Sequence, residues 1–221
     1  MSPRGRRSGR YCCHRRLDPV DAACFAGAQR LPFRNAEVFV RRAFLTAPEC
    51  AALVALIDAR RRPSTLADHD GGDGYRTSET CDLDGADPFV AAITARLAAY
   101  AWLDPAHAEP LQGQRYAVGQ QFKDHTDYFE PGGMEYDQYC SVAGQRSWTL
   151  MVYLNEPAAG GATRFRQLAK TIQPETGKLL AWNNMSADGT PNYATLHAGL
   201  PVRSGAKYII TSWFRERRWA G

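Results

Sequence analysis

The second half of the chain consists of short apolar segments separated by glycine, proline and polar residues. Between residues 111 and 217 these segments run from "GQRYAV" and "SWTLMVYLN" through "KLLAWNN" and "ATLHAG" to "KYIITSWFRE". Segments of this length, with turn residues between them, are typical of β-strands. The pattern therefore predicts a sandwich or barrel of strands over residues 109–221.

Two helices are predicted in the first half of the chain. Residues 46–61 have Thr46 as a candidate N-cap, a proline in the first turn and an apolar stripe behind it. Residues 87–103 have Asp87 as a candidate N-cap and Pro88 at the first helical position. We expect a mainly β protein of the α+β type, in which both helices pack outside the β core.

The first half also contains two candidate strands and a loop between them. Residues 36–44, "AEVFVRRAF", and residues 75–83, "YRTSETCDL", have strand character. The segment 64–74, "STLADHDGGDG", is polar and rich in glycine. We interpret its His69 and the neighbouring aspartates as solvated loop residues and not as metal ligands.

The net charge is distributed unevenly along the chain. The 221 residues carry +4, but residues 1–16 hold six arginines and no acidic residue, so the remainder carries 4 − 6 = −2. A mildly acidic body argues against a basic groove for nucleic acid at the active site. We predict a basic, disordered leader over residues 1–35 and a single domain over residues 36–221, with helical support over 36–108.

The cysteines and the apolar segments indicate the compartment. The chain has six cysteines without a C-x-x-C pair, and its N-terminal arginines are not followed by the apolar run of a signal peptide. No segment approaches the roughly 18 apolar residues that a membrane span needs. We therefore expect free thiols, a cytoplasmic location and no membrane association.

The segment "KDHTDYF" places a histidine and a carboxylate two residues apart. His125 and Asp127 lie in a run that is predicted to be a strand, where side chains two apart share one face. The later strand "ATLHAG" adds His197. Two histidines and one carboxylate form the facial triad that holds Fe(II) and leaves open coordination positions. The spacing alone is weak evidence, because H-x-D is common.

A lysine in the last predicted strand strengthens this interpretation. In "KYIITSWF", Lys207 shares one strand face with Ile209, Thr211 and Trp213. A cation on an inward face is costly to bury unless it meets an anion. A dicarboxylate such as 2-oxoglutarate would supply that anion, with its keto-acid end on the iron and its far carboxylate on Lys207 and the Thr211 hydroxyl.

With these residues, the sequence resembles the Fe(II)- and 2-oxoglutarate-dependent dioxygenases, and specifically their prolyl 4-hydroxylase-like branch. The resemblance is carried by "RYAVGQQFKDHTD" (115–127), "QRSWTLMVYLNEPAAGGATRF" (145–165), "IQPETGKLLAWNN" (172–184) and "LHAGLPVRSGAKYIITSWFRER" (196–217). These motifs occur in the order and spacing of the family. The resemblance implies a double-stranded β-helix core, of the jelly-roll or cupin type, in the C-terminal half.

The resemblance also implies roles for individual residues. His125, Asp127 and His197 would be the iron ligands, and Lys207 would bind the distal carboxylate of 2-oxoglutarate. Tyr116 would hydrogen-bond the same cosubstrate. The remaining implied site residues are Thr211 and Trp213 in the cosubstrate pocket, and Arg146 and Tyr128 beside the substrate.

The implied activity is hydroxylation of an unactivated C–H bond, with O2 as the second cosubstrate, ascorbate as a reductant, and succinate and CO2 as products. A prolyl residue of a peptide or protein is the expected substrate, and a free amino acid or other small molecule is the alternative. A non-catalytic sensor of 2-oxoglutarate and metal belongs to another class, as does a zinc hydrolase, which would have no use for Lys207. The residues do not indicate an oligomeric state.

The segment 129–145, "FEPGGMEYDQYCSVAGQ", lies between the metal-binding motif and the next predicted strand. Long polar segments beside a site are often lids or substrate-binding elements. We expect this segment to be such an element.

Overall fold

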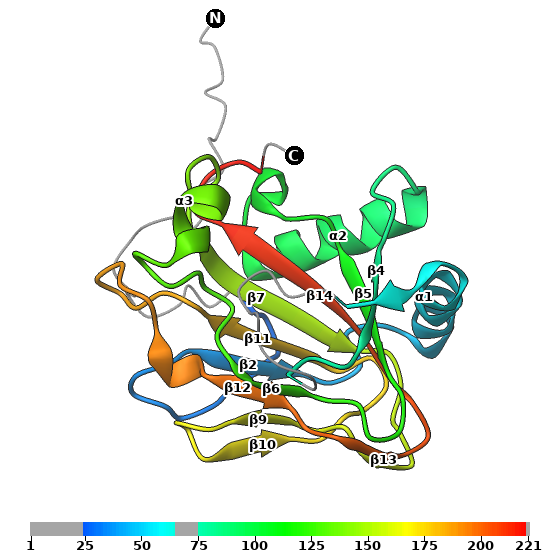
Figure 1. Cartoon of the computed structure of the whole chain (residues 1–221). Coiled ribbons are helices and arrows are strands. Elements are labelled where there is room, and N and C mark those ends of the chain that lie inside the picture. Colours follow the sequence, from blue (N-terminus) through cyan, green and yellow to red (C-terminus); the bar gives the residue numbers. More distant parts are fainter. Residues whose placement is uncertain (1–23, 65–74, 220–221) are drawn as a thin grey trace, which may run out of the picture.

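Two antiparallel sheets face each other in the computed structural model, which describes residues 24–64 and 75–219 (Figure 1). The larger sheet has eight strands in the order β1-β2-β11-β7-β14-β5-β4-β3, and the smaller has four in the order β10-β9-β12-β6. Strands β8 and β13 form a separate pair. Helices α1 and α2 lie on the outer side of the larger sheet (Figure 1).

The elements of the larger sheet are β1 (Gln29–Arg30), β2 (Val38–Arg41), β3 (Arg62–Pro63), β4 (Glu79–Asp82), β5 (Gln112–Tyr116), β7 (Arg146–Tyr153), β11 (Leu179–Asn183) and β14 (Lys207–Arg215). Those of the smaller sheet are β6 (Phe122–His125), β9 (Thr163–Phe165), β10 (Lys170–Ile172) and β12 (His197–Gly199), and the separate pair is β8 (Ala159–Gly160) and β13 (Val202–Ser204). The helices are α1 (Ala47–Arg60), α2 (Pro88–Ala101) and α3 (Met134–Cys140), with 3₁₀ turns at Pro105–His107 and Tyr193–Thr195.

The central strands of the larger sheet are buried on both faces. In β7, Leu150 and Val152 belong to the core under the helices, whereas Met151 and Tyr153 belong to the core between the two sheets. The near-continuous apolar runs of β7, β11 and β14 follow from this double burial. The predicted mainly β fold with two outer helices is confirmed.

Both predicted helices begin at their predicted caps. The Thr46 hydroxyl accepts from the Glu49 backbone N–H at 3.4 Å, and the Glu49 carboxylate accepts from the Thr46 N–H at 2.8 Å. This reciprocal pair is a capping box. The Asp87 carboxylate caps α2 by accepting from the Phe89 N–H at 2.8 Å.

Helix α1 approaches the sheet closely at one glycine. A Cβ atom on Gly113 of β5 would lie 2.4 Å from Cγ1 of Ile57, which is fully buried on α1. Only glycine permits this separation, because real Cβ atoms do not come so near. The contact fixes the position of β5, which ends at Tyr116.

The fold begins earlier than the predicted boundary at residue 36. Phe25 is 4% exposed and its ring stacks on Phe39 at 4.3 Å. Strand β1, at Gln29–Arg30, pairs with β2. The boundary was misplaced because the arginines dominate the composition of the first residues, while Phe25 and Leu31 bury enough apolar surface to join the core. Residues 1–23 lie outside the described residues.

Two predicted loops have different outcomes. Residues 65–74, with His69 and its aspartates, lie outside the described residues. The segment 129–145 contains α3, and its two ends are joined by hydrogen bonds between Phe129 and the Gln145 side chain. In the described part of the chain, no helix has the length and apolar character needed to cross a bilayer.

Candidate active site

Three side chains converge in the space between the two sheets. One ligand atom each of His125, Asp127 and His197 lies within 4.8 Å of the other two. Nε2 of His125 and Nε2 of His197 are each 3.9 Å from an Asp127 carboxylate oxygen. The imidazoles come from adjacent strands, since His125 on β6 pairs directly with His197 on β12.

Both histidines present the same nitrogen to the centre of the site. Nδ1 of His125 is 2.7 Å from the Lys123 carbonyl, and Nδ1 of His197 is 3.0 Å from the Thr195 carbonyl. A backbone carbonyl only accepts, so each Nδ1 carries the proton and each Nε2 keeps its lone pair. Burial lowers the pKa of His125 to about 3, which keeps that imidazole neutral. In both imidazoles, Nε2 is therefore the ring nitrogen left to bind a metal ion.

Asp127 stays ionised although it is buried. Burial favours its neutral form, but the positive charge of the Arg146 guanidinium and a hydrogen bond from Thr149 help to hold its pKa below the usual value. The Thr149 hydroxyl donates to Oδ2 at 2.6 Å, and the Asn184 amide donates to that hydroxyl at 2.8 Å. This chain fixes the orientation of the carboxylate.

The strand that carries His125 ends before Asp127. Strand β6 covers Phe122–His125, so Asp127 follows the strand and does not lie on it as the H-x-D spacing predicted. The pairing of β6 with β12 is irregular between His197 and Gly199, and pairing stops at His125. The chain turns there, and Asp127 faces the histidines from beyond the strand end.

Lys207 is the buried cation of the site. It is 1% exposed at the start of β14, and its Nζ lies 4.7 Å from the ring centre of Tyr116 and 5.7 Å from that of Tyr153. No carboxylate of the described residues lies within 4.0 Å of this nitrogen. Burial lowers the pKa of Lys207 to about 7. An anionic group that enters the pocket would supply the missing counter-charge of Lys207 and favour its protonated form.

One pocket joins the three candidate metal ligands to Lys207. Seven of the nine predicted site residues line it: His125, Asp127, His197, Lys207, Tyr116, Thr211 and Trp213. Tyr116 is paired with Lys207 across β5 and β14, and Gln112 is paired with Thr211 in the same ladder. The alternation of the two strands thus aims these side chains inward together.

The other two predicted residues lie outside the pocket lining. Arg146 makes two hydrogen bonds to the Glu109 carboxylate at 2.7 and 2.8 Å, lies 4.1 Å over the Trp213 ring, and approaches the Asp127 carbonyl at 3.4 Å. Tyr128 is buried, which raises its pKa. Their predicted contacts with a substrate stay predictions.

Sequence reasoning missed several residues that surround the site. Glu109 also lies 3.4 Å from the guanidinium of Arg215, so one carboxylate serves two arginines. Arg76 stacks over the ring of Phe122, which itself stacks on His125 at 3.5 Å. A possible signal was that Arg76 lies in a predicted strand and Glu109 just before one, where few charged residues are expected.

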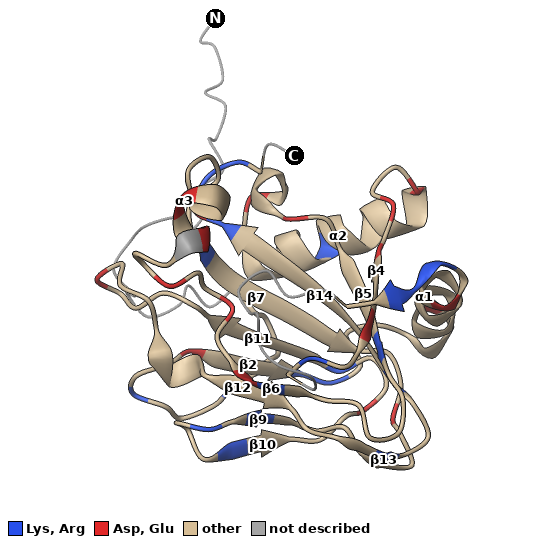
Figure 2. Cartoon of the chain, viewed as in Figure 1, with Lys and Arg blue, Asp and Glu red and all other residues tan. Residues whose placement is uncertain are grey.

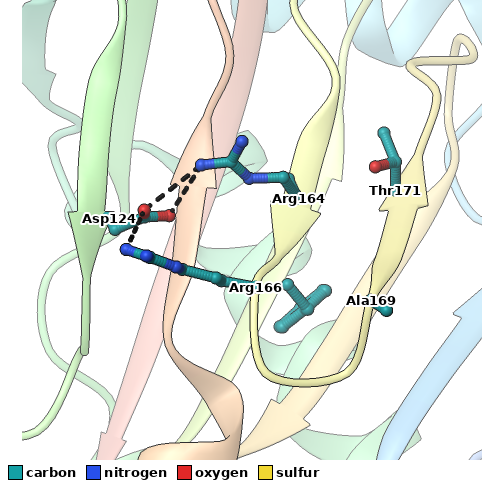
Figure 3. A pocket seen from close by; sticks show the side chains of 6 residues that line it. Asp124, Arg164, Arg166, Ala169 and Thr171 are labelled. Carbon is teal, nitrogen blue, oxygen red and sulfur yellow. Dashed lines mark hydrogen bonds and ion pairs between the residues drawn. The ribbon is translucent and has the colours of Figure 1, made fainter.

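A larger groove of about 550 Å³ lies on the outer face of the smaller sheet (Figure 3). Its charged residues bind one another: Asp124 accepts from Arg164 at 3.1 Å and from Arg166 at 3.3 Å. Arg164 crosses β12 at the small Ala198 to reach β6. The ion pairs connect β6, which carries His125, to β9 and Arg166 on the other side of β12, and the groove is separate from the pocket.

Charged residues are otherwise spread over the surface. In Figure 2, Lys and Arg occur on α1, α2, β9 and β10 and at the ends of other strands, without one continuous basic stripe in that view. The central strands between the helices and the smaller sheet are mostly uncharged (Figure 2).

Residues 111–215 match the family model described as the 2OG-Fe(II) oxygenase superfamily. The matched range contains all three candidate metal ligands and Lys207. The chain belongs to the 2OG-Fe(II) oxygenase superfamily. Within it, the chain is similar to prolyl hydroxylases.

Curated relatives of this superfamily member include animal and plant proteins. The chain is 34% identical over 167 residues to prolyl 4-hydroxylase subunit alpha-1 of Rattus norvegicus, which covers 72% of this chain and 31% of that protein. It is 31% identical over 202 residues to prolyl 4-hydroxylase 2 of Arabidopsis thaliana, covering 79% of this chain and 66% of that protein. The chain thus spans about a third of the length of the animal relatives it matches.

Solved structures share the arrangement of sheets. The viral collagen prolyl hydroxylase vCPH of Paramecium bursaria Chlorella virus-1, in its 2OG complex, gives a TM-score of 0.60 at 27% identity, covering 80% of this chain and 95% of that one. A prolyl-4-hydroxylase of Pseudomonas putida gives 0.57 at 21% identity, covering 82% and 93%, a likeness of fold alone. The predicted double-stranded β-helix core is confirmed by these neighbours.

The donor set of the site fits the cofactors of the superfamily, which are Fe(II), 2-oxoglutarate and O2. Two neutral imidazoles and one carboxylate are the ligands of non-haem Fe(II) oxygenases. The unpaired Lys207 at the base of the same pocket fits the distal carboxylate of 2-oxoglutarate.

Proposed function

We propose that this protein is an Fe(II)- and 2-oxoglutarate-dependent oxygenase that hydroxylates a prolyl residue of a peptide or protein. The observation that carries the proposal is that the triad of His125, Asp127 and His197 shares one pocket with the buried, unpaired Lys207. A zinc hydrolase would use the triad alone, whereas this cofactor pair uses both features.

The roles of the pocket residues follow from their positions. His125, Asp127 and His197 would hold the iron, and Lys207 would bind the distal carboxylate of 2-oxoglutarate by charge and hydrogen bonding. Thr211 lies four residues after Lys207 on the same face of β14 and would donate its hydroxyl to that carboxylate.

Two aromatic residues complete this assignment. The Tyr116 hydroxyl would donate a hydrogen bond to the cosubstrate from the facing strand β5. Trp213, held beneath the Arg146 guanidinium, would form the end wall of the pocket.

When bound, Fe(II) with 2-oxoglutarate and O2 supplies the oxidising chemistry that converts a C–H bond to C–OH, with release of succinate and CO2. The chain's own residues bind and orient these groups, and they exclude water from the site. Trp182 packs edge-on to His197 at 4.8 Å, and Phe122 stacks on His125 at 3.5 Å. These rings keep both imidazoles in place and shield the site from bulk water.

A peptide substrate is supported by the names of the relatives. The rat and Arabidopsis relatives and the viral structure are all named as prolyl hydroxylases. We propose that Arg146, Tyr128 and the segment 129–145 contact the peptide, because this segment begins two residues after Asp127. No nucleic acid is expected at the site.

Three further features belong to the proposal. Ascorbate would restore Fe(II) after turnover without substrate.

A reducing, cytoplasmic location is supported by Cys50, Cys81 and Cys140, which are free thiols. The fold would act as one functional domain, because strands from both halves of the chain pair within the larger sheet.

The test is an assay for oxygen transfer to defined substrates. Protein loaded with Fe(II) is incubated with 2-oxoglutarate, O2 and either a proline-rich peptide or free proline. We expect succinate release that depends on the peptide, and a peptide that gains one oxygen atom by mass spectrometry. Oxygen transfer to free proline alone would replace the peptide by a small molecule as substrate. Binding of 2-oxoglutarate without succinate from any substrate would favour a sensor.

A loop exchange tests the proposed peptide contact. Replacing residues 130–138 by a glycine–serine segment of equal length leaves the Phe129–Gln145 closure in place. The peptide KM should rise while the affinity for 2-oxoglutarate is unchanged. An unchanged KM for the peptide would remove this segment from the substrate site.

A further inference from the structure

A closed ring of hydrogen bonds runs from the cosubstrate pocket to its rim. Its members are Arg76, Ser78, Gln112, Gln114 and Tyr116, and we call it the Arg76 ring. The Tyr116 hydroxyl donates to Oε1 of Gln114 at 2.8 Å, and Nε2 of Gln114 donates to Oε1 of Gln112 at 3.1 Å. Arg76 donates to the same Gln112 oxygen at 3.2 Å and to the Ser78 hydroxyl at 3.1 Å, and Ser78 bonds Tyr116.

Arg76 sets the direction of the hydrogen bonds that run through Gln112 and Gln114 to Tyr116. A guanidinium has only donors, so Gln112 must present its oxygen to Arg76. The Asp82 carboxylate, an acceptor 3.4 Å from Nε2 of Gln112, fixes the same orientation. Gln114 must then present Nε2 to Gln112 and its oxygen to Tyr116. The single proton of the Tyr116 hydroxyl is therefore committed to Gln114.

This commitment conflicts with the proposed role of Tyr116. A cosubstrate carboxylate accepts hydrogen bonds and cannot donate, so it needs the Tyr116 proton that Gln114 now holds. Gln114 is 4% exposed and Tyr116 is 2% exposed, so a group that loses its partner there is not rescued by solvent. The ring must change when the cosubstrate binds.

Reversal of both amides satisfies Tyr116 and Gln114 again, and Gln112 gives up its hydrogen bonds to Arg76 and Asp82. If Gln114 turns its Nε2 to the Tyr116 oxygen, its own oxygen faces Gln112. Gln112 must then offer its nitrogen to Gln114 and can no longer offer its oxygen to Arg76. The Nη2 donor of Arg76 becomes free.

We propose that Gln114 is a positioning residue that couples cosubstrate binding at Tyr116 to release of the Arg76 donor at the rim of the pocket. Arg76 lies over Phe122, which lines the pocket beside His125, and it is partly exposed. The freed donor is placed to bind a carbonyl oxygen of a peptide. The inference rests on the proposed function, because it assigns 2-oxoglutarate to the Tyr116 side of the ring.

A double-mutant cycle tests the coupling without any substrate. The dissociation constant of 2-oxoglutarate is measured from the absorbance of the anaerobic Fe(II) protein in the wild type, Gln114→Leu, Tyr116→Phe and the double variant. Gln114→Leu removes the competing acceptor, so it should tighten 2-oxoglutarate binding about threefold to tenfold. In the Tyr116→Phe background the same change should alter the affinity less than about twofold.

Matched variants separate this effect from general damage. Gln173→Leu makes the same substitution at an exposed residue after β10 and should leave the affinity unchanged. Each variant is first checked by thermal unfolding, and Gln114→Met replaces Gln114→Leu if the latter does not fold. Equal effects of the Gln114 substitution with and without the Tyr116 hydroxyl would overturn the proposal.

A second measurement follows the Arg76 end of the ring. Binding of a labelled proline-rich peptide is measured without O2, with and without saturating 2-oxoglutarate. The wild type should bind the peptide more tightly with 2-oxoglutarate, and Gln114→Leu should lose that difference. An unchanged difference in Gln114→Leu overturns the coupling to Arg76. Absence of the 2-oxoglutarate absorbance in the wild type would instead contradict the proposed function itself.

Discussion

The central residue of the account is a lysine that the fold leaves without an anion. Lys207 is fully buried, its only described close partners are aromatic rings, and its pKa is lowered by burial to about 7. A buried cation without a partner is unfavourable, so binding of an anion beside it lowers the free energy of the protein. The binding of 2-oxoglutarate should therefore report the charge of this side chain.

The affinity for 2-oxoglutarate should fall with rising pH. Below pH 7, Lys207 is protonated in the free protein, and above it a proton must be taken up on binding. The dissociation constant should rise by up to about tenfold per pH unit above pH 7. The dissociation constant is measured by titrating the anaerobic Fe(II) protein with 2-oxoglutarate at pH values from about 6 to about 9, on both sides of the shifted pKa. Lys207→Met should bind weakly with no such slope, and a flat profile in the wild type would contradict the assigned role.

Removal of the negative charge of Glu109 should strongly lower the free energy of unfolding. It holds the partly buried guanidinium of Arg146 and the buried one of Arg215, so Glu109→Gln leaves both cations without this counter-charge. We expect a loss of about 3–5 kcal/mol in the free energy of unfolding, measured by urea denaturation. Glu156→Gln, at an exposed carboxylate, is the control and should cost less than about 1 kcal/mol. Similar losses for both would mean that the Glu109 pairs are screened by water.

At the scale of elements, the close approach of α1 to β5 supports the site. Gly113→Ala would force Ile57 and its helix away from the strand that carries Tyr116. We expect a loss of about 1–3 kcal/mol in the free energy of unfolding, since added atoms in a packed interface strain both partners. Gly85→Ala is the control, because no atom lies within 4 Å of a Cβ there. Equal stability of the two variants would show that α1 shifts freely.

The paired strands β6 and β12 place the two histidines opposite each other. Ion pairs on the outer face of the smaller sheet span β12, from Asp124 of β6 to Arg164 of β9 and to Arg166, and help to hold this pairing. Their side chains are 21%, 43% and 65% exposed, so the network contributes only modestly in water. The register of the site therefore depends mainly on the backbone pairing and on Phe165 between the sheets.

At the scale of the whole molecule, the described residues before residue 36 contribute to the core. Phe25 contacts Phe39, Tyr100 and Trp148, so it joins the first residues to α2 and the larger sheet. Phe25→Ala should lower the free energy of unfolding by about 3–5 kcal/mol. Thermal unfolding checks this against Tyr193→Ala, an aromatic residue that is 56% exposed. A negligible loss for Phe25→Ala would restore the predicted boundary at residue 36.

Local patterns in the sequence predicted the elements and the residues that share a strand face. The caps of α1 and α2 depend on neighbours within three residues, and Lys207 and Thr211 were placed together because strands alternate. The triad was recognisable because its residue types suit only a few metals.

Contacts between distant residues could not be predicted in the same way. The partner of Arg146 is Glu109, thirty-seven residues away, and that of Asp127 is Thr149, twenty-two residues away. A single glutamate or threonine in the sequence carries no mark of such a partner. Asp127 was assigned to a strand because the end of β6 is set by its pairing with β12 and not by its own residues. The Arg76 ring is hidden for the same reason.

The most direct test of the account is whether the metal triad and Lys207 act on one ligand. Metal-free protein is mixed with Fe(II) and then 2-oxoglutarate without O2, and the visible charge-transfer band of the chelated keto acid is recorded. We predict a band in the wild type, a much higher 2-oxoglutarate requirement in Lys207→Met, and no band in Asp127→Ala. Iron binding without a band, or a band that is insensitive to Lys207, would contradict the assignment of this pocket to 2-oxoglutarate.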